Sequence, residues 1–199
     1  KDLPTAEPAG LKIVAIPERA ETADLLLARR GILTRTHADP LGLPSGAVLG
    51  TSSLRRASQA LASSPAISVR ALRGNVPTRI RKLRDGDYDA ILLAAAGVRR
   101  LDLEIDDLES VELTPEVMLP APGQGALAIE TRAGDKATET LSTLNDPAVA
   151  SCVAAERRLL ELLGGGCHLP LGCLAREDET GIRLQAVLGE IDGEVTRAT

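Results

Sequence analysis

Short apolar runs alternate with polar segments that contain glycine or proline, and this pattern predicts most of the secondary structure. Apolar and β-branched residues at 11–16 indicate a strand, whereas the spacing at 21–30, followed by Gly31, predicts a short helix. The next part of the chain predicts strands at 47–49, 67–72 and 88–96, separated by a helix at 54–62 and a second helix between Pro77 and the Asp85-Gly86 pair.

Three strands joined by two helices predict a βαβαβ unit with a parallel sheet and right-handed crossovers. The run at 88–96 is continuously apolar, as expected of a strand that is buried on both faces. In such sheets, ligands bind beyond the carboxyl ends of the strands, where the helices begin. The residues expected in that region are Ser53, Arg55, Arg56, Arg73, Arg79, Arg99 and Arg100.

These arginines predict an anion site, because guanidinium groups bind carboxylate or phosphate through two parallel hydrogen bonds. The free N–H groups of helix N-termini add to the attraction. The alternative is that helical arginines are solvated on outer faces, and we favour it for Arg81 and Lys82. It stays open for Arg56 and Arg99. Arg55, Arg73 and Arg79 lie at or beside the strand-to-helix turns, which favours the anion site.

The middle of the chain gives weaker signals. Residues 102–122 are acidic, contain proline and are weakly periodic, so we expect them to cross the surface. The Gly123-Gln124-Gly125 turn precedes an expected strand at 126–130, and 137–144 is expected to be helical.

A longer helix is expected to begin at Asp146, the N-cap, and Pro147. Its inward-facing positions are mostly apolar, although Glu156 is one of them. Glycines at 164–166 end the helix. Three strands, at 171–175, 182–188 and 194–197, are then expected to form an antiparallel sheet on it.

Cys167 directly follows the three glycines, in a loop with little steric cover. A single cysteine beside glycines is a weak motif, so an unreactive loop thiol is the alternative to a site. The electronegative C-terminal end of the helix disfavours a thiolate, so any activation must come from elsewhere. Cys152 and Cys173 occupy helix and strand positions that predict burial.

Composition narrows the possible functions. The chain has 199 residues, of which 44% are hydrophobic, so it can bury a core. It has no Phe or Trp, one Tyr and a net charge of −5, which argues against nucleic acid as a partner. No apolar run is long enough for a membrane span, three cysteines suit a reducing compartment, and we expect no metal site.

Several stretches together resemble the porphobilinogen deaminase family, also called hydroxymethylbilane synthases. They follow the family order over nearly the whole chain: KDLPT (1–5), GTSSLRR (50–56), LRGNV (72–76) with TR (78–79), DYDAILLAAAG (87–97), LPAPGQGA (119–126) and GGC (165–167) with Pro170. Each stretch is modest evidence, but their joint occurrence is specific.

The resemblance implies periplasmic-binding-protein-like, two-lobed α/β domains and a small α+β C-terminal domain. Residues 1–28 and 123–143 would form part of domain 1, 29–122 domain 2, and 145–199 part of the third domain. Family residues before Lys1 and after Thr199 are absent. We therefore expect a fragment with little or no activity of its own.

The implied activity is the stepwise head-to-tail condensation of four porphobilinogen molecules, with loss of ammonia, in tetrapyrrole biosynthesis. The chain grows on a dipyrromethane cofactor held through a thioether, whose cysteine matches Cys167. Asp2 matches the catalytic aspartate, since one carboxylate can stabilise the cations formed during condensation. The matching cofactor-binding residues are Lys1, Ser53, Arg55, Arg56, Arg73 and Gly74, and the substrate-binding ones are Arg79 and Arg100.

The resemblance also implies a cytoplasmic monomer without a membrane or nucleic-acid partner, or a plastid protein if the missing N-terminus carries a transit peptide. A non-enzymatic binding module for a small polycarboxylate, with Cys167 incidental, is the alternative. A nucleotide-binding domain is weaker, because neither a P-loop nor a Gly-x-Gly-x-x-Gly motif follows a strand.

Overall fold

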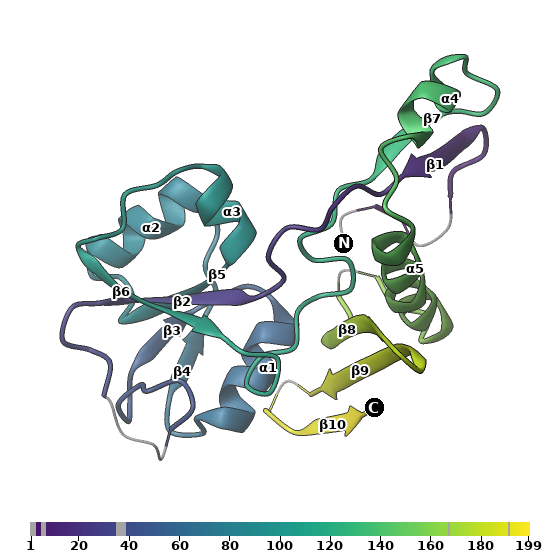
Figure 1. Cartoon of the computed structure of the whole chain (residues 1–199). Coiled ribbons are helices and arrows are strands. Elements are labelled where there is room, and N and C mark those ends of the chain that lie inside the picture. Colours follow the sequence, from purple (N-terminus) through teal and green to yellow (C-terminus); the bar gives the residue numbers. More distant parts are fainter. Residues whose placement is uncertain (1–2, 5–6, 35–38, 167, 191) are drawn as a thin grey trace.

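The computed structural model describes the chain apart from residues 1–2, 5–6, 35–38, 167 and 191. The largest sheet that it shows has the strand order β4-β3-β5-β2-β6 (Figure 1). These strands are β2 (Asp24–Arg29), β3 (Val48–Gly50), β4 (Ser68–Arg70), β5 (Ala90–Ala94) and β6 (Leu108–Leu113).

The predicted βαβαβ unit forms three of the five strands of this sheet. β3 pairs in parallel with both β4 and β5, and the connections are α1 (Leu54–Ser63) and α2 (Val76–Arg84). The two helices cover opposite faces of the sheet (Figure 1), with Ala60 of α1 in one apolar cluster and Ile80 of α2 in the other. The parallel-sheet prediction is therefore confirmed.

The helix predicted at 21–30 is wrong, because this segment contains strand β2. β2 lies between β5 and β6 and is antiparallel to both. Leu26 and Ala28 pack into one apolar cluster and Leu27 into the other, so alternate side chains enter the two cores. A continuous apolar run fits both a buried helix and a strand buried on both faces, and periodicity alone does not separate them.

Residues 102–122 also contain regular structure that the sequence pattern missed. They include β6, an edge strand whose middle residues are exposed and therefore do not show an apolar run. On the other side of β2, β5 ends before the predicted boundary, and α3 (Ala95–Arg100) follows it directly.

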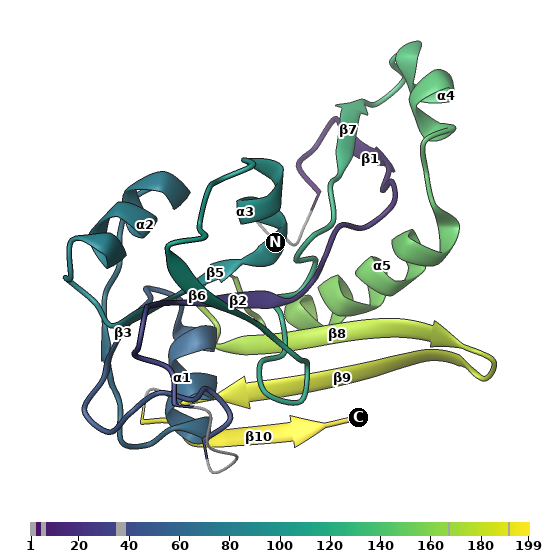
Figure 2. The same ribbon diagram turned by 60° about the vertical axis from the view of Figure 1, so that its left-hand side comes forward.

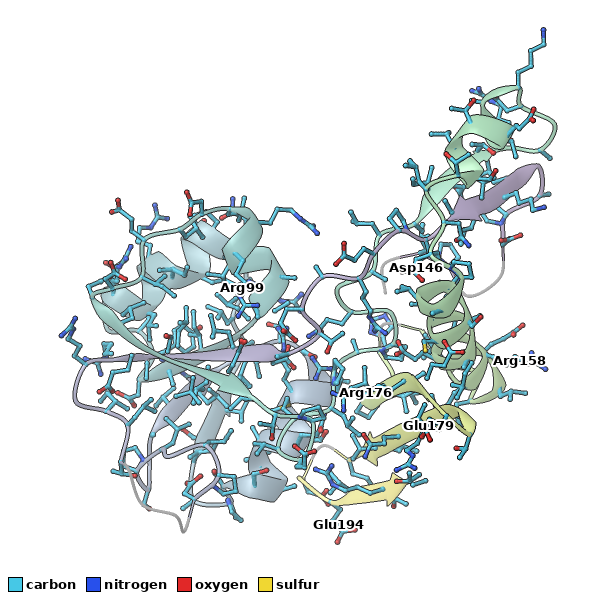
Figure 3. All side chains as sticks on the ribbon, viewed as in Figure 1. Arg99, Asp146, Arg158, Arg176, Glu179 and Glu194 are labelled. Carbon is cyan, nitrogen blue, oxygen red and sulfur yellow. The ribbon has the colours of Figure 1, made fainter. Side chains whose placement is uncertain are left out.

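The C-terminal part is the predicted antiparallel sheet on one helix. α5 (Pro147–Leu162) packs against a sheet of order β10-β9-β8, with β8 (Leu171–Asp178), β9 (Gly181–Gly189) and β10 (Val195–Ala198). Asp146 (labelled in Figure 3) caps α5 as expected, because its carboxylate accepts hydrogen bonds from the backbone N–H groups of Ala148 and Val149.

The remaining elements form an arm that extends from the two sheets (Figures 1 and 2). β1 (Leu11–Ala15) and β7 (Ile129–Arg132) pair in antiparallel fashion, and α4 (Ala137–Ser142) lies beside them. These elements confirm the strand predicted at 11–16. They also confirm the strand near 126–130, displaced by a few residues, and a shorter form of the helix predicted at 137–144.

The proposed division into three domains remains a prediction. Strand β2 (Asp24–Arg29) belongs to the five-stranded sheet, although all but its last residue were assigned to domain 1. The other four strands of this sheet lie within 29–122, the segment assigned to domain 2. α5 and its sheet lie within 145–199. Among the described residues, no helix has both the length and the apolar character needed to cross a membrane.

The C-terminal sheet packs closely against α1 (Figure 2). At Gly193 the backbone has φ +96°, and a Cβ atom there would lie 2.8 Å from Leu61 Cβ of α1. The turn between β9 and β10 thus approaches α1 to a distance that only glycine permits.

We expect Gly193→Ala to destabilise the protein by about 2–4 kcal/mol, because strain at positive φ adds to overpacking against α1. Urea unfolding measures this loss. Gly134→Ala is the matched control, since Gly134 also has a positive φ (+79°) but a Cβ atom added there would meet no other atom within 4 Å. Equal losses in the two variants would contradict close packing at Gly193.

Candidate functional site

A cavity of about 300 Å³ lies where the N-terminus of α1, the turn before α2 and the loop after α5 meet. Its polar lining, called the arginine wall, consists of Ser52, Ser53, Arg55, Arg56, Arg73, Arg79 and Gln124. Its apolar lining consists of Ala121, Pro122, Leu160, Leu169 and Leu171, and Gly166 lines the cavity as well. The volume is at the lower end of the usual range for small-molecule sites, about 300–1,000 Å³.

Hydroxyl groups fix the two strand ends that carry the arginine wall. Ser52 Oγ donates to the carbonyl oxygen of Leu72 (2.9 Å) and accepts from its N–H (3.0 Å), which joins the segments after β3 and β4. Ser53 is the N-cap of α1, and its side chain accepts from the backbone N–H of Arg56 (3.4 Å). The first turn of α1 is thereby held at the cavity.

The turn before α2 needs glycine at position 74. Gly74 has φ +122°, and a Cβ there would lie 2.8 Å from Thr78 Cγ2. Its carbonyl oxygen accepts a hydrogen bond from Arg79 Nε (2.7 Å), while Asn75 caps the helix. Gly74 therefore orients Arg79, and Arg73 precedes the same turn.

Positive charge gathers on this wall. Partial burial lowers the pKa of Arg79, and the nearby charges of Arg56 and Arg73 lower it further. Within the described part of the chain, neither Arg73 nor Arg79 forms an ion pair with a carboxylate. Crowded cations without a protein counter-ion favour binding of an anionic ligand.

Arg55 and Arg56 are different, because both are buried and pair with Asp24 of β2. Arg56 Nη2 lies 2.7 Å from Asp24 Oδ1, and Arg55 Nη1 lies 2.7 Å from Oδ2. The Arg55 contact is not aligned as a hydrogen bond, and Asp24 Oδ2 and Arg55 Nε have no hydrogen-bond partner among the described atoms. Burial alone would raise the pKa of Asp24, but the charges of the two guanidinium groups outweigh it and lower the pKa to about 2.

Gln124 joins this group to the rest of the cavity. Its Nε2 donates to Asp24 Oδ1 (3.0 Å) and to the carbonyl oxygen of Thr22 (2.7 Å). Its Oε1 faces Arg55 Nη2 at 3.4 Å. Gln124 is only 2% exposed, so its amide is committed to these contacts.

A second buried carboxylate belongs to α5, which also supplies Leu160 to the cavity. Glu156 of α5 is fully buried and binds Arg19 through two hydrogen bonds, of 2.8 and 2.9 Å. Glu156 also accepts from the backbone N–H groups of Gly123 (2.7 Å) and Ala175 (2.8 Å). These contacts join α5 and β8 to the segment before β2 and to the turn at 123–125.

A family model described as porphobilinogen deaminase, dipyromethane cofactor binding domain, matches residues 1–140, and the C-terminal domain of the same enzyme matches 150–199. The chain belongs to the porphobilinogen deaminase family. It is 44% identical to the porphobilinogen deaminase of Roseiflexus castenholzii over 99% of this chain and 63% of that protein. It is 46% identical to that of Oceanobacillus iheyensis over 97% of this chain and 60% of that protein. The chain thus spans less than two thirds of these relatives.

A solved structure with a more distant likeness is substrate-binding domain 2 of GlnP from Lactococcus lactis, in its open conformation. The TM-score is 0.40 with 12% identity, covering 77% of this chain and 58% of that one. This likeness is too low to assign a function.

The structure brings together five of the residues predicted from the family motifs. Ser53, Arg55, Arg56, Arg73 and Arg79 all line the cavity, and Gly74 supports Arg79. Arg100 is exposed at the end of α3 and is not among the cavity residues. The predicted residues Lys1, Asp2 and Cys167 lie outside the described residues, although Gly166, the neighbour of Cys167, lines the cavity.

The alternatives left open for two arginines are now decided. A solvated outer face is wrong for Arg56, which is 8% exposed and paired with Asp24. It is correct for Arg99 (labelled in Figure 3), whose exposed side chain pairs with Glu112 of β6 at 2.6 Å. Cys152 and Cys173 are buried as predicted, and burial raises the pKa of Cys173 to about 12, so that it stays a thiol at neutral pH.

Sequence reasoning missed the two buried carboxylate networks, those of Asp24 and of Glu156. Glu156 was the available signal, because a carboxylate in the apolar stripe of a helix requires a buried partner. The glycines around Gln124 suggested only a tight turn, and Asp24 fell within a segment predicted to be helical. Neither Arg19 nor Asp24 stands out in the sequence by any spacing.

The ion pairs of Asp24 with Arg55 and Arg56 should make the free energy of unfolding depend on pH. The pKa of Asp24 is lower in the folded protein (about 2) than its ordinary value of 3.8. Its contribution, roughly 2 kcal/mol, is therefore complete above pH 4 and is lost as the pH falls toward 2. The difference in unfolding free energy between the wild type and Asp24→Asn, measured across this range, isolates it from other carboxylates. A difference that stays constant with pH would contradict the ion pair.

Proposed function

We propose that the full-length protein is a hydroxymethylbilane synthase, which condenses four porphobilinogen molecules head to tail, with loss of ammonia, on a covalently bound dipyrromethane. Family membership supports the reaction class. The observation that carries the proposal is the cavity itself, because its lining combines arginines with apolar side chains and includes Gly166, the neighbour of Cys167. Pyrroles that carry acetate and propionate arms need both surfaces.

The residues present fit the cofactor. Arg73 and Arg79 have no carboxylate partner among the described residues, and the buried Nε of Arg55 has no hydrogen-bond partner there. A ligand with several carboxylate arms would supply the missing acceptors. Leu160, Leu169 and the neighbouring apolar residues would pack against the rings and exclude water.

Cys167 is proposed as the attachment point, through a thioether. When bound, the dipyrromethane supplies the terminal pyrrole to which the first substrate unit is joined. Cys167 needs its thiolate form only for the attachment step. The thioether is then stable through later condensations.

Asp2 is proposed as the catalytic residue, with Lys1 in the same site. Departure of ammonia from porphobilinogen leaves a positive charge on the substrate pyrrole. A carboxylate that faces the pyrrole N–H stabilises this charge until the condensation product loses its proton. Arg79 and Arg100 are proposed to bind the carboxylate arms of the incoming substrate.

Intact-mass measurement tests the attachment. Full-length protein from cells that make tetrapyrroles should carry one additional dipyrromethane mass, and Cys167→Ser should remove it. Cys152→Ala is the control, because Cys152 is buried in α5 and should leave the added mass unchanged. Wild-type protein with only the polypeptide mass would favour the binding module instead.

Substitution of one arginine tests the anion wall. Arg79→Ala should lower kcat/KM for ammonia release by about tenfold to a hundredfold, since it removes charge-assisted hydrogen bonds of roughly 1.5–3 kcal/mol. Arg81→Ala is the matched control on the same helix, because Arg81 is exposed and does not line the cavity. Equal rates in the two variants would show that Arg79 does not bind substrate.

A further inference from the structure

Asp24 lies behind the arginine wall and does not itself line the cavity. Its carboxylate is fully buried. Oδ1 accepts from Arg56 Nε (3.1 Å), Arg56 Nη2 (2.7 Å) and Gln124 Nε2 (3.0 Å), while Oδ2 lies 2.7 Å from Arg55 Nη1. The carboxylate of Asp24 therefore contacts Arg55, Arg56 and Gln124, all three of which line the cavity.

The other contacts of the two guanidinium groups are to backbone carbonyl oxygens. Arg56 Nη1 donates to Leu92 (3.2 Å), and Arg55 Nη1 donates to Leu119 (2.6 Å). Since Leu92 lies in β5 and Leu119 in the segment before the turn at 123–125, the planes of the two guanidinium groups are fixed from two directions. Asp24 is the shared contact that keeps these two like charges side by side.

We propose that Asp24 is a positioning residue, which with Gln124 orients Arg55 and Arg56 so that their remaining N–H groups meet the carboxylate arms of a pyrrole ligand. This inference rests on the proposed function for the identity of the ligand. The negative charge of Asp24 acts in the opposite direction, because it lowers the positive potential that attracts an anion. Removal of the Asp24 charge therefore distinguishes the two effects. Affinity for the ligand should fall if orientation of the arginines dominates, and it should rise if the effect of the Asp24 charge on the positive potential dominates.

The test measures binding of a probe that cannot react, namely porphobilinogen without its aminomethyl group. This pyrrole keeps one acetate and one propionate arm but has no leaving group. Calorimetric titration uses the full-length protein with Cys167→Ser, whose cavity holds no covalent dipyrromethane. In this background Asp24→Asn should raise Kd about tenfold to a hundredfold, as expected for misaligned charge-assisted hydrogen bonds. Unchanged or tighter binding by folded Asp24→Asn would overturn the proposal.

Asp89→Asn is the matched control. Asp89 also pairs with an arginine of the same sheet, Arg29 at 2.6 Å, but does not line the cavity. It should lower the melting temperature without a change in Kd, whereas a rise in Kd equal to that of Asp24→Asn would assign the effect to general destabilisation.

If Asp24→Asn does not fold, Gln124→Met tests the proposal with the same measurement. Methionine keeps the volume of the side chain and removes its hydrogen bonds to Asp24 and Arg55, so Kd should rise at least threefold, and an unchanged Kd would overturn the proposal. Absence of probe binding by the full-length protein with Cys167→Ser alone would count against the proposed function, because it concerns the cavity before Asp24 or Gln124 is changed.

Discussion

Two buried carboxylates, Asp24 and Glu156, hold the parts of this structure together. A buried charge is tolerated only when opposite charges and hydrogen bonds replace its lost hydration. Glu156 has four such hydrogen bonds, from Arg19 and two backbone N–H groups. Asp24 has two guanidinium groups and the amide of Gln124. Because these partners come from distant segments, the carboxylates are satisfied only when those segments are assembled.

Gln124 makes the two groups one continuous network. Its side chain donates to Asp24, and its backbone carbonyl oxygen accepts a hydrogen bond from Arg19 Nε (2.9 Å). Arg19 is also the partner of Glu156. The same segment is held from α1, where the amide of Gln59 exchanges two hydrogen bonds with the backbone of Leu119. The cavity lining comes mainly from the segments before α1 and α2, from residues 121–124, and from α5 and the loop after it. Through Glu156, Gln124 and Asp24, this network connects α5 to residues 121–124 and to the arginines of α1.

Local sequence patterns predicted the elements whose apolar faces repeat with one clear period. α1, α2 and α5 have such faces, and Asp146 and Gly74 carry signals that depend only on neighbouring residues. β2 was mispredicted because burial on both faces removes the alternation that identifies a strand. In the site, motifs identified the arginines at strand ends, but the partners of Arg55 and Arg56 come from β2, and pairing between distant segments leaves no local pattern.

The same pairing divides the arginine wall into two kinds of positive charge. Arg55 and Arg56 are buried, and protein acceptors fix their orientation before any ligand arrives, which lowers the entropic cost of binding. Arg73 is exposed and Arg79 half-buried, and neither has a carboxylate partner in the described part of the chain. The carbonyl oxygen of Gly74 holds Arg79 through its Nε, so both arginines can offer terminal N–H groups to a ligand. In the proposed function, the buried charges would set the position of the bound end, and the charges without carboxylate partners would pair with the carboxylates of each added pyrrole.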